Sequence, residues 1–524
     1  MSTTSAKLSF REKACYSLGD ASANFVFQTM IIFQMGFYTD VFGITPWLAG
    51  ILLVGVRLLD ACFDPIVGTL ADRTKTRWGK FRPWVLFSAP FFGVIFWLTF
   101  TTPDLNPTGK AVYAVVLYIM LMMIYSINNV PYSALTGVMT SDGEERTKLS
   151  SYRFVAATVA TLLVQSLTLP LVAKFGGVSA WRKENAEELA TWLAANPDKS
   201  EKLHPAIIAM NQHGWSVTFG IFAAIAVVFF VITFLNVKER VKPDPGQKES
   251  TRKNLTAINN KPWYAMFILT LFVFITLALR GGGLYYYFSY YMDTTAMYDF
   301  LIGFGLQMPT GDMNLWQKFL NALGLFVESD KTNVTAVCLG FNNFVGNIVT
   351  TIGVICSPFL VGKFGKKPVF LVGLTATAFA QAAVFLVSPT QPMLMMWMGI
   401  LWGVCYGPTI PVLWAMIADV ADYSEWKNNY RATAFVFAGV VFALKAGLGF
   451  GGAIGGWILE AYGYVANAAQ SASSLLGIQL SASIYPAICF AIAASCLIFY
   501  PITTQKLKEI QAELEERRKG FGNQ

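Results

Sequence analysis

The sequence predicts an all-α integral membrane protein. Of its 524 residues, 55% are hydrophobic and only 13% are charged, and the mean hydropathy is +0.49. A soluble chain carries about 25% charged residues. This much apolar surface cannot be hidden in one core, so much of it must face lipid. The composition therefore excludes a cytosolic enzyme.

Twelve long apolar runs, bounded by charged residues, Pro or Gly, predict twelve transmembrane helices. Each run is long enough to cross a hydrocarbon layer about 30 Å thick. In chain order the expected helices are 15–40, 46–71, 82–102, 110–139, 147–173, 215–237, 262–291, 335–362, 367–388, 392–420, 430–459 and 476–502.

The basic residues predict the topology. The formal net charge is +8, but Lys and Arg are spread over short loops and form no stripe of the kind that binds nucleic acid. With a cytoplasmic N-terminus, 27 of them fall on the cytoplasmic side, 8 on the opposite side, and the rest at membrane depth. Because cytoplasmic loops carry the excess of Lys and Arg, we expect both termini in the cytoplasm.

A basic, Pro-containing linker divides the helices into six and six. Basic, glycine-containing turns, GTLADRTKTRWGKFRP and VGKFGKKP, follow the second helix of each half. Similar turns in corresponding positions indicate two related six-helix bundles, the arrangement that supports alternating access. The predicted units are a first bundle at 1–237, the linker at 238–261, a second bundle at 262–502 and a cytoplasmic tail helix at 503–524.

Two long polar inserts interrupt the pattern on the outer side. The first, 175–214, predicts an amphipathic helix plus a turn, and the second, 292–334, has no clear period. Each is either a lid over a central cavity or an inert elaboration.

The second expected helix carries three charges at membrane depth, where each costs about 2.5–3.5 kcal/mol and indicates a function. At about 100° per residue, Arg57, Asp60 and Asp64 share one narrow sector of the helix. Two carboxylates one turn apart can ligate a small hard cation or share one proton. We expect cation or proton coupling at Asp60 and Asp64, with Arg57 as a structural charge that keeps one carboxylate ionised. The alternative is an Arg–Asp pair that only braces helix packing.

Two further cations lie deep in the second half. Lys445 stands among small residues that permit close helix approach, and we expect it to meet the carboxylate pair and compete with the coupling ion. Arg280 precedes Gly281, Gly282 and Gly283, which favour a helix broken beside a polar cavity. Arg280 is then expected to meet substrate hydroxyls or a substrate carboxylate.

Neutral polar residues in the first and fourth helices suit a polyhydroxylated ligand, with interhelical hydrogen bonding as the alternative. They include Asn24, Tyr125, Ser126 and Asn129. Only two histidines are present and no phosphate-binding glycine loop occurs, so we expect no enzyme, no cofactor and no ATP hydrolysis. Transport is therefore expected to be secondary.

Five motifs carry a family resemblance: RLLDACFDPIVGTLADRTKTRWGKFRPW, YSLGD, NNVPYSAL, YYYFSYYM and WAMIADVADYSEWKNNYR. With them the chain resembles the glycoside-pentoside-hexuronide:cation symporter family of the major facilitator superfamily, of the melibiose-permease type. The resemblance covers nearly the whole chain. It implies cation-site roles for Asp60, Asp64, Ser126 and Lys445, and a sugar contact for Arg153. The other expected substrate-binding residues are Asn24, Tyr125, Asn129, Arg280 and Trp414. Melibiose permease has aspartates where this chain has Asn24 and Asn129, so a galactoside is not expected.

The predicted protein is thus a twelve-helix major facilitator that carries a sugar or glycoside inward with Na+ or H+. We expect a monomer in a bacterial inner membrane, with cytoplasmic gate contacts among Arg73, Arg77, Asp419 and Asp422. If the coupling ion is sodium, Asp60 and Asp64 are its expected ligands. The alternatives are a sodium-coupled lysolipid carrier and a sugar receptor that does not transport.

Overall fold

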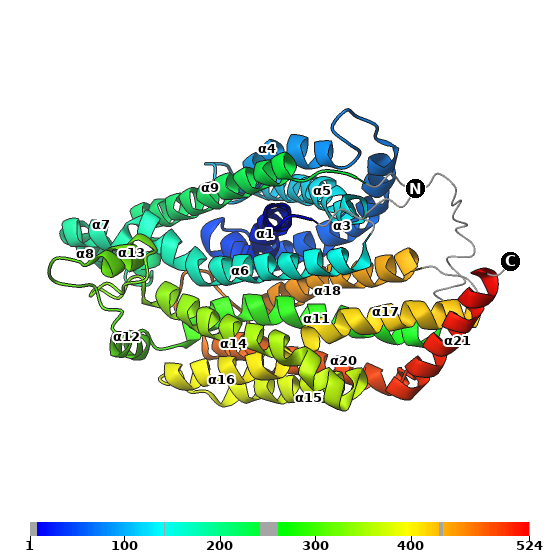
Figure 1. Ribbon diagram of the computed structural model, residues 1–524. Coiled ribbons are helices and arrows are strands. Elements are labelled where there is room, and N and C mark those ends of the chain that lie inside the picture. Colours follow the sequence, from blue (N-terminus) through cyan, green and yellow to red (C-terminus); the bar gives the residue numbers. More distant parts are fainter. Residues whose placement is uncertain (1–7, 141, 241–259, 429–432, 523–524) are drawn as a thin grey trace.

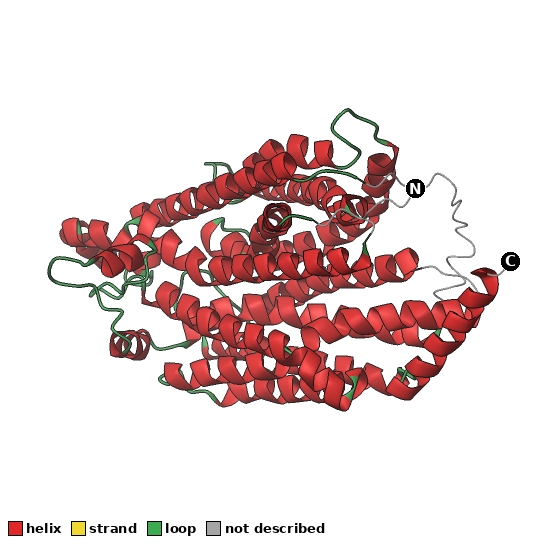
Figure 2. Ribbon diagram, viewed as in Figure 1, coloured by secondary structure: helices red, strands yellow, loops and turns green. Residues whose placement is uncertain are grey.

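The computed structural model describes residues 8–140, 142–240, 260–428 and 433–522. In this part of the chain the secondary structure is helical apart from two isolated bridges, and Figure 2 shows no strand there. The long helices run side by side, and both chain termini lie at one end, the terminus end (Figure 1). The opposite end, where α7 (Val178–Glu184), α8 (Ala186–Ala195) and α13 (Leu315–Ala322) lie, is called the insert end.

The helices of the two halves occupy different parts of the molecule, the first half above and the second below in Figure 1. The first half contains α1 (Phe10–Ile32) with α2 (Gln34–Gly36) and the π-helix η1 (Phe37–Val41), α3 (Pro46–Arg73), α4 (Arg82–Thr99), α5 (Pro107–Met139), α6 (Gly143–Gly176) and α9 (Pro205–Asn236). The second half contains α11 (Lys261–Tyr286) with the π-helix η3 (Tyr287–Tyr291), α14 (Val334–Phe364), α15 (Lys366–Ala383) with η4 (Val384–Leu386), α16 (Pro392–Tyr406) with α17 (Thr409–Asn428), α18 (Thr433–Ala461), and α19 (Ala472–Ala482) with α20 (Ile484–Cys496) and η5 (Leu497–Phe499). A tail helix, α21 (Thr504–Gly522), follows.

Every apolar run of the sequence contains a long helix, which confirms the all-α fold class. Ten helical segments of the described chain are long and apolar enough to cross a membrane. The segments 10–41 and 46–73 are not among these ten, so the count of twelve crossings stays a prediction. The domain boundaries also stay predictions, and most of the linker 238–261 lies outside the described residues.

Capping residues explain why several helices begin earlier than hydropathy predicts. The side chain of Asn106 accepts a hydrogen bond from the backbone N–H of Gly109, and Pro107 occupies the first turn of α5. Asn260 caps α11 in the same way. The first N–H groups of a helix have no partner within the helix; an Asn cap accepts a hydrogen bond from one of them, and Pro has no N–H group to leave unpaired. The helices therefore start where the polar caps lie, outside the apolar run.

The inserts form short helices. The expected amphipathic helix of the first insert is present as α7 and α8, followed by the 3₁₀ turn η2 (Glu201–Leu203). The second insert, for which the sequence showed no clear period, contains α12 (Thr294–Gly303) and α13. A capping box between Asn314 and Gln317 starts α13. This local signal could have been found in the sequence, since its spacing is that of the known motif.

The expected break in the seventh helix is wrong. Helix α11 continues through Gly281, Gly282 and Gly283 to Tyr286. Two of the glycines serve close packing, because a Cβ atom on Gly283 would lie 2.8 Å from the backbone oxygen of Ser481, and one on Gly281 would lie 3.1 Å from that of Ile31. Two neighbouring helices thus approach α11 where no side chain intervenes.

The halves touch along several helix pairs, among them α1 with α11, and share an apolar core at the insert end. Helix α18 packs on α3, and α14 packs on α6. Gly452 and Gly456 of α18 leave room for Leu53 and for the backbone of Pro46 on α3. One core cluster includes buried residues of both halves, among them Phe37 and Tyr286, whereas a second cluster near the terminus end is confined to the second half. The described structure is therefore packed more tightly between the halves at the insert end.

Candidate functional site

Four of the predicted site residues meet at one point between the halves. Asp60 and Asp64 project from α3, Ser126 from α5 and Lys445 from α18. The Lys445 Nζ atom lies 2.9 Å from Asp60 Oδ2 and 2.6 Å from Asp64 Oδ2. The Ser126 Oγ atom lies 2.6 Å from Asp60 Oδ1 and 2.7 Å from Asp64 Oδ1. Because a hydroxyl carries one proton, Ser126 can donate to only one of the two carboxylates at a time.

The charges of this cluster do not balance. Two carboxylates face one ammonium group, which leaves a net charge of −1 when all three are ionised. The Asp60 side chain is fully buried, that of Asp64 is 23% exposed and that of Lys445 is 10% exposed. Asp60 Oδ2, although it lies close to Lys445, receives no hydrogen bond of good geometry. A buried carboxylate oxygen without a donor is costly unless a cation or a proton satisfies it.

Arg57 does not pair with these carboxylates, contrary to the expectation that it holds one of them ionised. Its Nη2 atom lies 3.8 Å from the sulfur of Met30, and the ion-pair partner of both carboxylates in the described structure is Lys445. Arg57 is buried and lines a cavity between the halves. The remaining wall is mostly apolar, formed by Met30, Ile31, Met35, Leu53, Tyr118, Ala278, Leu279, Gly282, Gly283, Tyr286, Leu448, Gly451, Gly452, Gly455, Leu459 and Ser481.

Two of the predicted sugar-contacting residues of the first half, Asn24 and Arg153, form a second cluster. Arg153 of α6 makes an ion pair with Asp20 of α1 at 3.0 Å, and its guanidinium lies over the rings of Tyr16 and Tyr132. The side-chain amide of Asn24 donates to the backbone oxygen of Asp20. The sequence analysis missed Asp20 as a site residue, although it ends the YSLGD motif.

The other predicted sugar contacts have different hydrogen-bond and packing partners. The side chain of Asn129 donates a hydrogen bond to the Tyr125 hydroxyl one turn earlier on α5. In the second half, Arg280 Nε donates to Gln381 Oε1 at 2.9 Å, and its guanidinium stacks on Trp402 at 4.0 Å. Trp414 packs against the apolar core of the second half. None of these residues lines the cavity described above.

Two of the predicted gate residues have a partner outside the predicted set. Asp419 pairs with Lys366 of its own half at 2.7 Å, and the Arg77 guanidinium lies over Trp78. The gate assignment of Arg73, Arg77, Asp419 and Asp422 stays a prediction.

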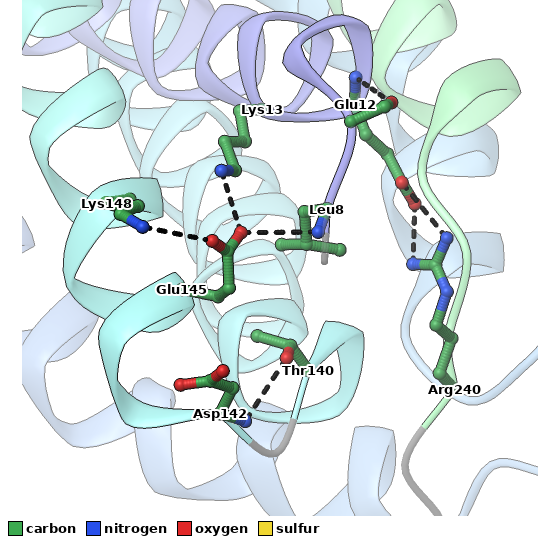
Figure 3. Close-up of polar contacts among 9 residues, drawn as sticks. Leu8, Glu12, Lys13, Thr140, Asp142, Glu145, Lys148 and Arg240 are labelled. Atoms are coloured by element: carbon green, nitrogen blue, oxygen red, sulfur yellow. Dashed lines mark hydrogen bonds and ion pairs between the residues drawn. The ribbon is translucent and has the colours of Figure 1, made fainter. Parts of the chain in front are cut away.

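A different ion cluster stands at the terminus end, within the first half. The Glu145 carboxylate of α6 accepts from the backbone N–H of Leu8 and pairs with Lys13 at 2.7 Å (Figure 3). Beside it, Glu12 holds Arg240, which follows α9, through two hydrogen bonds of 2.6 and 3.0 Å. These contacts tie the start of α1 to α6 and to the segment that leads into the linker.

The insert end holds a polar network between the halves that the sequence analysis also missed. The Asp40 carboxylate of η1 accepts hydrogen bonds from the hydroxyls of Tyr290 and Tyr464, and Asn467 donates to the Asp40 backbone oxygen at 2.6 Å. Lys202 of the first insert lies over the Tyr290 ring. Burial lowers the pKa of Lys202, and the nearby Asp40 carboxylate opposes this shift. The network joins the π-helical ends of the first helix of each half.

Comparison with solved structures identifies the fold. The chain is similar to a bacterial homologue of the human lysosomal transporter Spinster in an inward-facing, unoccupied conformation, with a TM-score of 0.60 and 14% identity over 96% of this chain and 99% of that one. It is also similar to the nucleoside transporter NupG, with a TM-score of 0.54 and 11% identity over 94% of this chain and 100% of that one. The chain therefore shares the fold of these two solved structures.

Sequence comparison then gives the family. The model of the MFS/sugar transport protein family matches residues 15–341 and 320–504. The inner membrane symporter YicJ of Escherichia coli is 32% identical over 98% of this chain and 96% of that protein. The isoprimeverose transporter of Lactiplantibacillus pentosus is 30% identical, with 97% and 91% covered. The chain belongs to this family, the glycoside-pentoside-hexuronide:cation symporters. It is a multi-pass membrane protein that transports sugar together with a cation, and it is not an enzyme.

Proposed function

We propose that cation coupling in this sugar symporter depends on Asp60, Asp64, Ser126 and Lys445. The observation that supports this proposal is the ion pairing of Lys445, a residue of the second half, with both carboxylates of the first half. A coupling cation, Na+ or H+, has the same charge as the ammonium group and competes for the same oxygens. The site therefore exchanges one cation for another.

This exchange changes the contact between the halves. With no coupling ion, Lys445 bridges α18 to α3. A bound ion weakens that bridge. Conformations that keep the bridge between the halves and conformations that lack it therefore have different affinities for the ion. A difference of this kind is what couples an ion gradient to a conformational equilibrium. We place both termini in the cytoplasm of a bacterium and propose that a monomer carries the sugar inward.

We further propose an anionic sugar as the substrate. Arg280 has Gln381 and Trp402 as neighbours, and no carboxylate is recorded as its partner among the described residues. A guanidinium inside a helix bundle without a counter-ion suits a substrate carboxylate or sulfonate, which its planar fork can bind through two hydrogen bonds. One relative that covers 98% of this chain is named a glucuronide carrier protein homolog, and that protein is 28% identical.

Arg280→Gln tests this assignment. We expect the affinity for a uronide to fall roughly ten- to hundredfold, because a hydrogen bond to a charged group contributes about 1.5–3 kcal/mol. The affinity for a neutral glycoside should be unchanged, and Arg280→Lys should retain part of the uronide affinity. The measurement is competition for uptake in proteoliposomes. An equal loss for charged and neutral sugars would assign Arg280 to helix packing instead.

The proposed function as a whole is tested by uptake of a radiolabelled glycoside panel in proteoliposomes, with Na+ and H+ gradients imposed separately. We expect at least one sugar to accumulate against its gradient with one of the ions. Sugar binding without uptake would indicate a receptor. Uptake of a lysolipid and of no sugar would indicate the lipid-carrier alternative.

A further inference from the structure

Helix α13 of the second insert exposes an apolar face. Leu315, Trp316 and Phe319 are 86%, 64% and 52% exposed, and the Trp316 and Phe319 rings stack on each other at 5.6 Å. This is a large apolar area for a segment outside the candidate spans. Water is a poor solvent for such a face, so a covering surface is expected.

Helix α13 is amphipathic, but its apolar side faces away from the protein. At about 100° per residue, the three exposed apolar side chains lie within one arc of roughly 100°. The opposite side, with Gln317 and Asn321, is half-buried, and Lys174 of α6 donates to the Asn321 backbone oxygen. The polar side thus faces the protein and the apolar side faces outward.

The position of α13 identifies what covers it. Gly324, just after the helix, has a positive φ of 70°, and a Cβ atom there would lie 2.5 Å from the backbone oxygen of Pro170. Pro170 lies six residues before the end of α6 at Gly176, so this contact is about 9 Å inside the end of a membrane-spanning helix. Helix α13 therefore stands at the level where the apolar spans end, with α7 and α8 beside it at the same end (Figure 1).

We propose that α13 is an interfacial anchor whose apolar face lies in the boundary between the lipid headgroups and the acyl chains at the insert end. Trp is enriched at this boundary, and short amphipathic helices bind there through one apolar face. Lys318 borders the apolar arc and is exposed, which places a cation within reach of lipid phosphates. The anchor would fix the second insert to the bilayer while the Lys174 contact links it to the first half. This inference is independent of which sugar is carried.

The test places an environment-sensitive fluorophore on cysteines introduced one at a time. Phe319→Cys and Leu315→Cys report on the apolar face, and Gln317→Cys is the matched control on the protein-facing side. The labelled wild-type chain gives the background from its seven native cysteines. Each protein is placed as a single copy in lipid nanodiscs, and quenching by nitroxide-labelled lipid is compared with quenching by aqueous iodide.

We expect the labels at positions 319 and 315 to be quenched several-fold more by lipid nitroxides than the label at 317, and to be shielded from iodide. Equal access of iodide to all three positions would overturn the proposal. Shielding that is present in densely packed proteoliposomes but lost in single-copy nanodiscs would assign the face to a second copy of the chain, and would also overturn it. Sugar uptake by the same variants shows independently that each one is folded.

Discussion

Asp64→Asn is expected to abolish gradient-driven sugar accumulation while sugar binding persists. In the native cluster two carboxylates face one ammonium group, so an incoming cation meets a net negative charge. The substitution leaves Asp60 and Lys445 as a neutral pair. One unit charge at 4 Å contributes about 4 kcal/mol at an effective dielectric constant of 20, so cation affinity should fall by roughly a thousandfold. Uptake driven by an imposed gradient and calorimetric sugar binding are the two measurements.

Asp72→Asn is the matched control for this experiment. Asp72 lies on the same helix, but its side chain is 66% exposed and its ion pair with Lys80 is at the surface. An exposed pair contributes about 0–1 kcal/mol. Accumulation should be unchanged in this variant. Undiminished accumulation by Asp64→Asn would show that the ion enters elsewhere, and equal loss in both variants would point to damaged folding.

Arg153→Gln is expected to weaken sugar binding about ten- to hundredfold, since a hydrogen bond to a charged group contributes about 1.5–3 kcal/mol. The Arg153 side chain is 24% exposed, and its guanidinium lies over two tyrosine rings and is held by Asp20. It is thus fixed in place yet still reachable by a ligand. Asp20→Asn should have a smaller effect, because the positive charge remains while its position is less well defined. Calorimetric titration with the transported sugar measures both variants.

A structural role for Arg153 would give a different pattern. Loss of either partner of the pair would then lower the melting temperature by a similar amount, with little change in sugar affinity of the folded protein. Lys148→Gln, near the start of the same helix, is the control, since its ammonium is 46% exposed. Cation binding at Asp60 and Asp64 should be retained in every one of these variants.

The sequence alone was sufficient to predict the helices and to place Asp60 and Asp64 on the same face of one helix. Hydropathy marks a membrane helix because the bilayer core admits few charges, and helical periodicity places residues 60 and 64 on one face. Capping motifs would have improved the boundaries. The depth of Lys445 among small residues predicted that it meets this pair, and the family resemblance added Ser126; in the structure both contact the two carboxylates.

Only the tertiary structure decided which helix faces meet. Lys445 and Ser126 are 319 residues apart in the chain, Asp40 and Tyr290 are 250 apart, and Arg153 and Asp20 are 133 apart. Periodicity relates side chains on one helix but gives no register between two helices. For this reason the contact of Arg57 with Met30 in place of the carboxylates, the Asp40 network and the outward apolar face of α13 could be seen only once the helices were packed.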